Sequence, residues 1–217
     1  MRCLVLSSLV VLLLFNERVS ALKRIDPTKH EYVGENERRY PVFESIKYRS
    51  SIDVIGKHLS GILIFKTQED SSIRAVFVNE MGVTFFDITF FDDSYKFNSI
   101  MESMDKKAVK ISLAKDLGMI LMRGIFDKKY KISGHLMQAS HPIAFIVNLK
   151  LKRKGTVKYH CISNSPEIPL IENYGRKKKV ISIQQFYLNK NSMPDSIFVQ
   201  HHTVNFTISL KQLNVTE

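Results

Sequence analysis

The stretch from Lys57 to Phe97 constrains the fold of this chain more than any other part of the sequence. Turns of two to five residues separate its four consecutive strand candidates, which are Lys57–Lys66, Ser72–Glu80, Val83–Phe91 and Ser94–Phe97. Strands joined this closely must be antiparallel, because a parallel pair needs a crossover of about a dozen residues or more. The stretch therefore predicts an antiparallel meander.

Two strands of this meander carry apolar side chains on both faces. The first contains the run Gly61–Phe65, and the third places phenylalanines on both sides of the pleat between Val83 and Phe91. A sheet this apolar must be covered on one side. We expect Phe86, Ile88 and Phe90 to lie on the covered, inner face.

After the meander the apolar period changes from two to about 3.6, which indicates helix. Ser99 and Glu102 match a helix capping box, and Gly124 stands where a C-terminal glycine belongs. Lys115 and Asp116 are expected on the polar side. The apolar residues that recur at helical spacing are Val109, Leu113, Leu117, Ile120 and Leu121. We expect this apolar stripe to pack on the inner face of the sheet.

Further strands flank this core. Apolar and polar residues alternate from Ile46 to Val54, and the later candidates are 143–151, Thr156–Ile162, 168–171 and 180–188. The last strand places Val204, Phe206, Ile208 and Leu210 on one face. The predicted fold class is mainly β (α+β), a half-open antiparallel β-barrel of roughly ten strands wrapped around a central helical insertion.

The first residues predict export. Residues 1–21 read as a signal peptide, with an apolar core from Leu4 to Phe15 and the small-residue cleavage site Val19–Ala21; the alternative is a membrane helix. Residues 22–41 are expected to be a tether and 42–217 a single domain. Cleavage would remove Cys3 and leave Cys161 alone, so no disulfide is expected within a monomer. No cysteine follows the apolar core as a lipid attachment site.

The chain is strongly basic. Its net charge is +11, and losing Arg2, Arg18 and Glu17 with the signal peptide would leave +10. Such a charge favours either a solvated surface or contact with an anionic membrane, whereas an exported chain rarely meets nucleic acid. The basic turn (Arg176, Lys177, Lys178 and Lys179) is the predicted contact with an anionic surface.

The residues that usually carry catalysis do not form a catalytic constellation. His201 and His202 fall on opposite faces of one strand, with His202 expected on the Val204 face, so they cannot share a metal ion. His160 and Cys161 point apart in the same way. The clustered carboxylates read as turn caps: Asp87, Asp92 and Asp93. We predict a non-enzyme without cofactor or metal.

The order of elements resembles a known family. The segments Ser60–Ile64 and Val78–Asp87, a helical pair and late strands resemble the outer-membrane lipoprotein carriers and receptors of Gram-negative bacteria, the LolA/LolB-like superfamily, with uncharacterised Bacteroidetes members as the nearest pattern. The resemblance implies a hydrophobic cavity for acyl chains between sheet and helices. Its expected lining is Phe86, Ile88, Phe90, Leu113, Leu117, Val204, Phe206 and Ile208.

The resemblance also implies a protruding turn with one apolar residue that touches the membrane. That turn maps to Asn79–Gly82, and Met81 is its apolar residue; the alternative is an ordinary hairpin residue that tucks back on the protein. We therefore expect a monomeric periplasmic or outer-membrane-associated protein that binds a lipid or an acylated protein. The alternative is an interaction module of an outer-membrane assembly whose barrel is filled by its own side chains.

Overall fold

The computed structural model describes the following residues: 43, 45–54, 56–126, 135–137, 144–153, 155–162, 165–188 and 193–213. The chain divides into two compact units, residues 1–34 and 35–217, and every described residue belongs to the second. The predicted signal peptide (1–21) and tether (22–41) lie outside the described residues.

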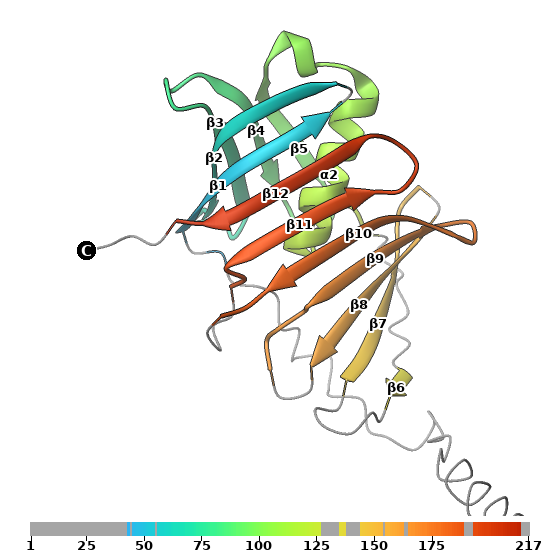
Figure 1. Ribbon diagram of the computed structural model, residues 1–217. Helices are drawn as coiled ribbons and strands as arrows, with labels where there is room; N and C mark the ends of the chain where they lie inside the picture. Colours follow the sequence, from blue (N-terminus) through green and yellow to red (C-terminus); the bar gives the residue numbers. More distant parts are fainter. Residues whose placement is uncertain are drawn as a thin grey trace, which may run out of the picture. The chain divides into compact units, whose positions relative to one another are not determined.

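A single antiparallel sheet contains all the strands of the described part (Figure 1). The strands are β1 Ser45–Val54, β2 Lys57–Thr67, β3 Ile73–Val78, β4 Thr84–Phe90, β5 Tyr95–Ile100, β6 His135–Met137, β7 Ala144–Lys150, β8 Thr156–Ile162, β9 Leu170–Gly175, β10 Lys178–Phe186, β11 Ser196–His201 and β12 Phe206–Gln212. Their order across the sheet is β5-β4-β3-β2-β1-β12-β11-β10-β9-β8-β7-β6. Between β5 and β6 the chain forms a 3-10 turn, Glu102–Met104, and the helix α2, Lys107–Leu121.

The structure confirms a mainly β, antiparallel fold with a central helix. It has twelve strands in the described residues, where roughly ten were expected. It does not confirm a barrel, because β5 and β6 are the two ends of the strand order rather than partners. The predicted meander is present as β2 to β5, with each strand paired to the next.

The inner face of the sheet follows from the alternation of the sequence. In β1, Tyr48 and Ile52 are buried while Lys47 and Arg49 are exposed, as the pattern predicts. At the centre of the sheet, Ile52 pairs with Ile208 of β12, and both are 1 % exposed or less. Successive side chains point to opposite faces of a strand, so one apolar face is turned to the interior from β4 through β1 and β12 to β8, whereas the edge strand β5 has no buried residue.

The helix begins later than the capping box predicted. Ser99 belongs to β5 and pairs with Asp87, and α2 begins at Lys107 without a side-chain cap. Pairing with β4 therefore outweighs the local preference for a cap at Ser99. The helix ends at Leu121, and its C-cap residue is Met122, which adopts a left-handed φ of 55°. This cap lies two residues before Gly124, where the sequence predicted the end of the helix.

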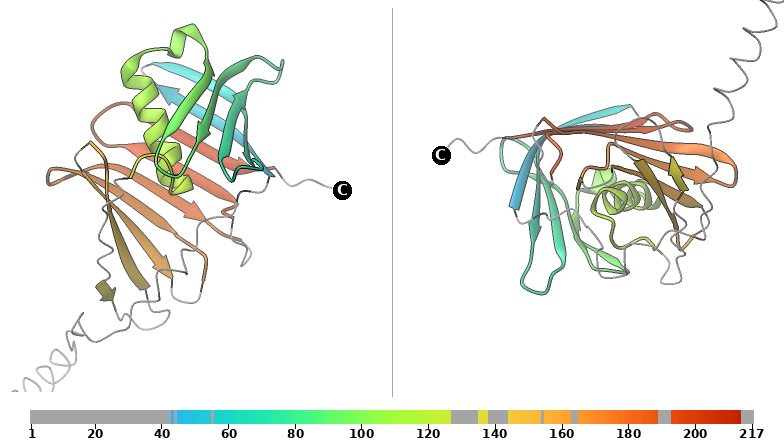
Figure 2. Two further views of the ribbon diagram at one scale, coloured as in Figure 1. Left: turned by 180° about the vertical axis from the view of Figure 1, so that it is seen from behind. Right: turned by 90° about the horizontal axis from the view of Figure 1, so that it is seen from below.

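The second half of α2 is buried on all sides. Only one apolar stripe was expected, but every residue of α2 except Lys115 is buried from Leu113 to its end. Figure 2 shows why, because the sheet curves around the helix when the molecule is viewed from below. A helix surrounded in this way needs no polar face. Among the described residues, no helix combines the length and the apolar character needed to cross a bilayer.

Candidate functional site

The concave face of the sheet and α2 enclose a continuous apolar layer. Seven of the eight residues expected to line a ligand cavity lie in it with exposed fractions of 3 % or less, namely Phe86, Ile88, Phe90, Leu113, Leu117, Phe206 and Ile208. A side chain that exposes almost no surface is surrounded by other protein atoms. Around these residues the interior is therefore packed, with α2 as its central element.

Val204 does not belong to this layer. Its side chain is 55 % exposed, which corrects the prediction that it shares the inner face with Phe206. The physical reason is the position of the turn, because β12 begins only at Phe206 and residues 202–205 form the connection from β11. Strand alternation cannot be extended backward through a turn.

The same turn reverses the predicted faces of two histidines. His201 is the last residue of β11 and continues the inward face of Ile197 and Val199, whereas His202 is exposed. His202 Nε2 lies 3.0 Å from Ser182 Oγ on the outside. The prediction that His202 faces the core is wrong, because His202 follows the end of β11 and does not lie on the last strand.

His201 meets a buried carboxylate of the helix. Its Nε2 lies 2.8 Å from Asp116 Oδ2, and the two side chains are 6 % and 0 % exposed. Burial raises the pKa of Asp116, while the neighbouring His201 and Lys115 act in the opposite direction. The prediction that Asp116 lies on the polar side of the helix is therefore wrong.

A signal for Asp116 was present in the sequence. Leu113, Asp116, Leu117 and Ile120 follow the spacing i, i+3, i+4, i+7, so the aspartate falls within the apolar stripe. A carboxylate at a stripe position requires a buried partner, because leaving its charge unpaired in an apolar interior costs far more than exposing it. The sequence does not say which of several histidines provides that partner.

Met81 projects from the hairpin that joins β3 to β4. The backbone N–H groups of Met81 and Val83 donate to Asn79 Oδ1 at 3.0 and 2.8 Å, and Gly82 takes a left-handed φ of 82°. An asparagine that accepts from its own turn fixes the turn in this way. Met81 and Val83 are 86 % and 46 % exposed. The turn thus holds two apolar side chains in solvent.

The basic turn forms the tip of the β9–β10 hairpin, and its four side chains are exposed. Lys179 Nζ lies 3.2 Å from Glu172 Oε1, so this carboxylate offsets part of the local charge. The exposed residues Lys152 and Arg153 occupy the neighbouring tip between β7 and β8. Because β8 pairs with β9, two basic tips separated in the sequence lie at the same end of adjacent hairpins (Figure 1).

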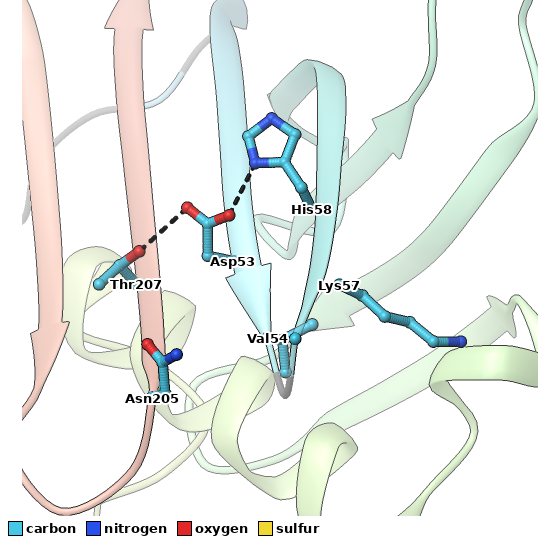
Figure 3. A pocket seen from close by; sticks show the side chains of 7 residues that line it. Asp53, Val54, Lys57, His58, Asn205 and Thr207 are labelled. Atoms are coloured by element: carbon cyan, nitrogen blue, oxygen red, sulfur yellow. Dashed lines mark hydrogen bonds and ion pairs between the residues drawn. The ribbon is translucent and has the colours of Figure 1, made fainter.

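A polar pocket of about 300 Å³ lies where β1 turns into β2 beside the start of β12, at the edge of the apolar layer (Figure 3). Within it, His58 Nδ1 lies 2.7 Å from Asp53 Oδ1, and Thr207 donates to Asp53 Oδ2 at 3.4 Å. Its lining is Asp53, Val54, Gly56, Lys57, His58, Asn205 and Thr207. These mainly polar side chains do not suit a hydrocarbon chain, and none belongs to the expected site.

The candidate catalytic residues are engaged in structural contacts. Burial raises the pKa of the Cys161 thiol to about 11, which keeps it protonated near neutral pH. Asp87 accepts from Arg74 and from Asn98 on the outer face of the sheet. His160 lies 3.0 Å from Glu172. The described residues contain no group of three or more side chains able to hold a metal ion.

These features define a class of fold, an open antiparallel sheet that curves around one helix with an apolar layer between them. Neither a protein-family model nor a curated protein sequence matches this chain. Solved structures match it by shape.

Three such structures resemble the chain over most of its length. A putative outer membrane lipoprotein-sorting protein domain from Vibrio parahaemolyticus covers 83 % of this chain and 88 % of its own, with a TM-score of 0.55 and 9 % identity. A DUF1329 family protein from Desulfovibrio piger covers 79 % of this chain and 84 % of its own, with a TM-score of 0.52 and 10 % identity. A LolA superfamily protein from Nitrosomonas europaea covers 78 % of this chain and 83 % of its own, with a TM-score of 0.51 and 7 % identity.

This likeness confirms the resemblance at the level of the fold. The chain has the fold of the LolA/LolB-like superfamily, although its sequence is no more than 10 % identical to these structures. The nearness to Bacteroidetes members stays a prediction.

Proposed function

We propose that this chain is an exported, non-catalytic protein that binds a lipid, or the acyl chains of a lipoprotein, between α2 and the concave face of the sheet. The apolar layer that one helix shares with a curved open sheet carries the proposal. One neighbour in shape is described as a putative lipoprotein-sorting domain and another as a LolA superfamily protein, which supports it. The periplasm, or the periplasmic face of the outer membrane, is the matching location.

Binding in this layer requires the helix to give way. Leu113 and Leu117 of α2 are 1 % exposed or less, so a hydrocarbon can enter only where helix side chains now lie. Each buried CH2 contributes about 0.8 kcal/mol, and a chain of about a dozen carbons therefore supplies about 10 kcal/mol. In this proposal the curved sheet forms a half-open barrel, and movement of α2 gives the hydrocarbon access to its concave face.

The second candidate function is an interaction module whose interior stays filled by its own side chains. The observation that favours it is the same burial of the predicted lining. Native mass spectrometry of gently purified protein distinguishes the two. A copurified lipid adduct supports the carrier, whereas a clean apo mass with a stably bound protein contradicts it and supports the module.

Met81 is the proposed membrane contact of the β3–β4 hairpin. Met81→Glu should weaken binding to liposomes while the melting temperature stays unchanged, because the side chain is 86 % exposed and leaves no cavity. Leu188→Glu is the matched control, since Leu188 is 84 % exposed on a different hairpin. Unchanged liposome binding of Met81→Glu, or equal loss in the control, would remove Met81 from the contact.

The basic turn is the proposed contact with anionic head groups. Changing its four cations to glutamine should reduce binding to anionic vesicles and leave binding to neutral vesicles unaltered, with the difference shrinking at high salt. The matched control neutralises the same number of exposed lysines elsewhere on the sheet: Lys47, Lys66, Lys96 and Lys211. If the control loses as much binding, net charge rather than this turn determines the contact.

A further inference from the structure

The buried pair of Asp116 and His201 joins the helix to the sheet. Asp116 Oδ2 and His201 Nε2 lie 2.8 Å apart, and neither side chain is more than 6 % exposed. Asp116 Oδ1 is buried and has no hydrogen-bond partner. An ionisable pair between two elements, held away from water and incompletely bonded, is an unusual feature of an otherwise apolar interface.

The sheet side of this contact is rigidly placed. The His201 ring stacks on Phe206 of β12 with centroids 4.7 Å apart and planes 26° apart. His201 also pairs with Ile181 of β10, so it is fixed by strands on both sides. One turn along the helix, Tyr159 of β8 donates to the carbonyl of Met119 at 2.9 Å. This second contact does not change with protonation near neutral pH, because burial raises the pKa of Tyr159 well above its ordinary value.

The pair is electrically neutral when it contains one extra proton. Either His201 is an imidazolium that donates its Nε2–H to the carboxylate, or the carboxyl O–H donates to Nε2 of a neutral ring. Loss of that proton leaves a buried carboxylate beside a neutral ring, which can still donate one N–H but no longer offsets the negative charge. Among the described groups, His201 of β11 and the half-buried Lys115 of the helix itself are the titratable side chains that act on Asp116.

We propose that Asp116 and His201 form a proton-controlled latch, which holds α2 against the sheet while the pair contains one proton and releases the helix when that proton is lost. The purpose of the latch rests on the proposed function, because release of α2 uncovers the apolar face to which an acyl chain would bind. The existence of the latch does not rest on the proposed function, because opening of the helix can be measured without any ligand.

The sign of the pH dependence follows from the protonation states. Docking of the helix depends on a bound proton, so docking is retained below the pKa of the pair and is lost as pH rises through it. The direction agrees with the raised pKa of Asp116, because burial makes its ionised form unfavourable in the folded protein. Linkage of one proton predicts that the opening constant of α2 rises about tenfold per pH unit between the ordinary pKa of a solvated histidine, about 6.5, and the higher pKa of the docked pair, and that it levels off above that pKa.

Hydrogen exchange tests the latch on the full chain without ligand. Protection factors of the α2 amides are measured from about pH 6 to about pH 9, alongside amides of β1 and β12, which report global unfolding at the centre of the sheet. Wild type should lose about tenfold of α2 protection per pH unit above about pH 6.5. The α2 amides should stay less protected than those of β1 and β12 throughout, because the helix opens before the sheet unfolds, whereas global unfolding, which also separates the pair, shifts β1 and β12 in parallel. Asp116→Asn should remove the slope, because a neutral amide can still bond to a neutral ring.

A matched control is available in the same chain. Asp53 and His58 form an aspartate–histidine pair of 2.7 Å, but their side chains are 51 % and 62 % exposed on the outer face. Asp53→Asn should keep the wild-type slope for α2. If Asp116→Asn does not fold, Asp116→Leu provides the second variant, because it removes the buried carboxyl and fills its place with an apolar side chain, with the same expected loss of slope. A wild-type slope in either latch variant, or a flat wild-type profile, overturns the proposal.

A separate measurement keeps the latch and the proposed function apart. Uptake of a fluorescent fatty acid is followed over the same pH range. Opening of α2 without uptake supports the latch and contradicts the binding site. Uptake without a pH-dependent opening of α2 contradicts the latch and leaves the binding site supported.

Discussion

Truncation of Leu113 measures directly how tightly α2 fills the interior. Leu113 exposes 0 % of its surface at the middle of the helix and belongs to the same apolar core as Phe86 and Ile88. Leucine-to-alanine changes at buried sites cost about 2–5 kcal/mol, and a site closed on every side belongs in the upper part of that range, about 3–5 kcal/mol. For a domain of this size each kcal/mol lowers the melting temperature by about 2–4 °C, so Leu113→Ala should melt about 6–20 °C below wild type.

Urea and thermal unfolding followed by circular dichroism provide the measurement. Leu188→Ala is the control, because Leu188 is 84 % exposed and its truncation should change stability by less than about 0.5 kcal/mol. A loss below about 1 kcal/mol for Leu113→Ala would refute the reasoning, because it would mean that the leucine has room around it. A large loss would instead show that any acyl ligand must compete with the helix for the same space.

Two further predictions concern the sheet. Gly61→Ala should destabilise the protein by several kcal/mol in urea unfolding, because an added Cβ would lie 2.0 Å from the Val78 carbonyl oxygen, and a variant as stable as wild type would contradict this backbone approach. Burial raises the pKa of Asp87, but hydrogen bonds from Arg74 and Asn98 outweigh it and hold that pKa below its ordinary value of 3.8. Arg74→Met should therefore cost roughly 1–3 kcal/mol at neutral pH, and the cost should vanish as pH falls through the folded pKa of Asp87; a cost that does not vary with pH would contradict the ion pair.

The meander and the helix could be predicted because the signals that specify them are local. Short turns require antiparallel neighbours, and β2 to β5 follow one another in the sheet as expected. The residues Thr156–Ile162 even match β8 end to end. By contrast, β11 (Ser196–His201) was missed, because the sequence pattern treated His201 and the residues of β12 as one strand. That single error reversed the faces of two histidines and misplaced Val204.

The buried pair was not predictable because its two halves lie 85 residues apart in the sequence. The spacing of Asp116 within an apolar stripe indicates that a partner exists, but only the packing of α2 against β11 selects His201. The sequence also could not predict whether the sheet is open or closed into a barrel. It depends on whether β5 and β6 pair, and no local pattern determines the distance between two edge strands.

An apolar face of a sheet must be buried, but the periodicity of the sequence does not specify whether a helix, a loop or a ligand buries it. Here α2 covers the concave face, with nine of its residues buried. A hydrocarbon of about a dozen carbons offers about 10 kcal/mol, and it can displace the helix only if the helix costs less than that to move. Loss of the His201 partner lowers that cost, since a carboxylate left unpaired in the interior opposes docking of the helix. Under the proposed function, the affinity for acyl chains should therefore depend on Asp116 and His201, although neither residue needs to touch the ligand.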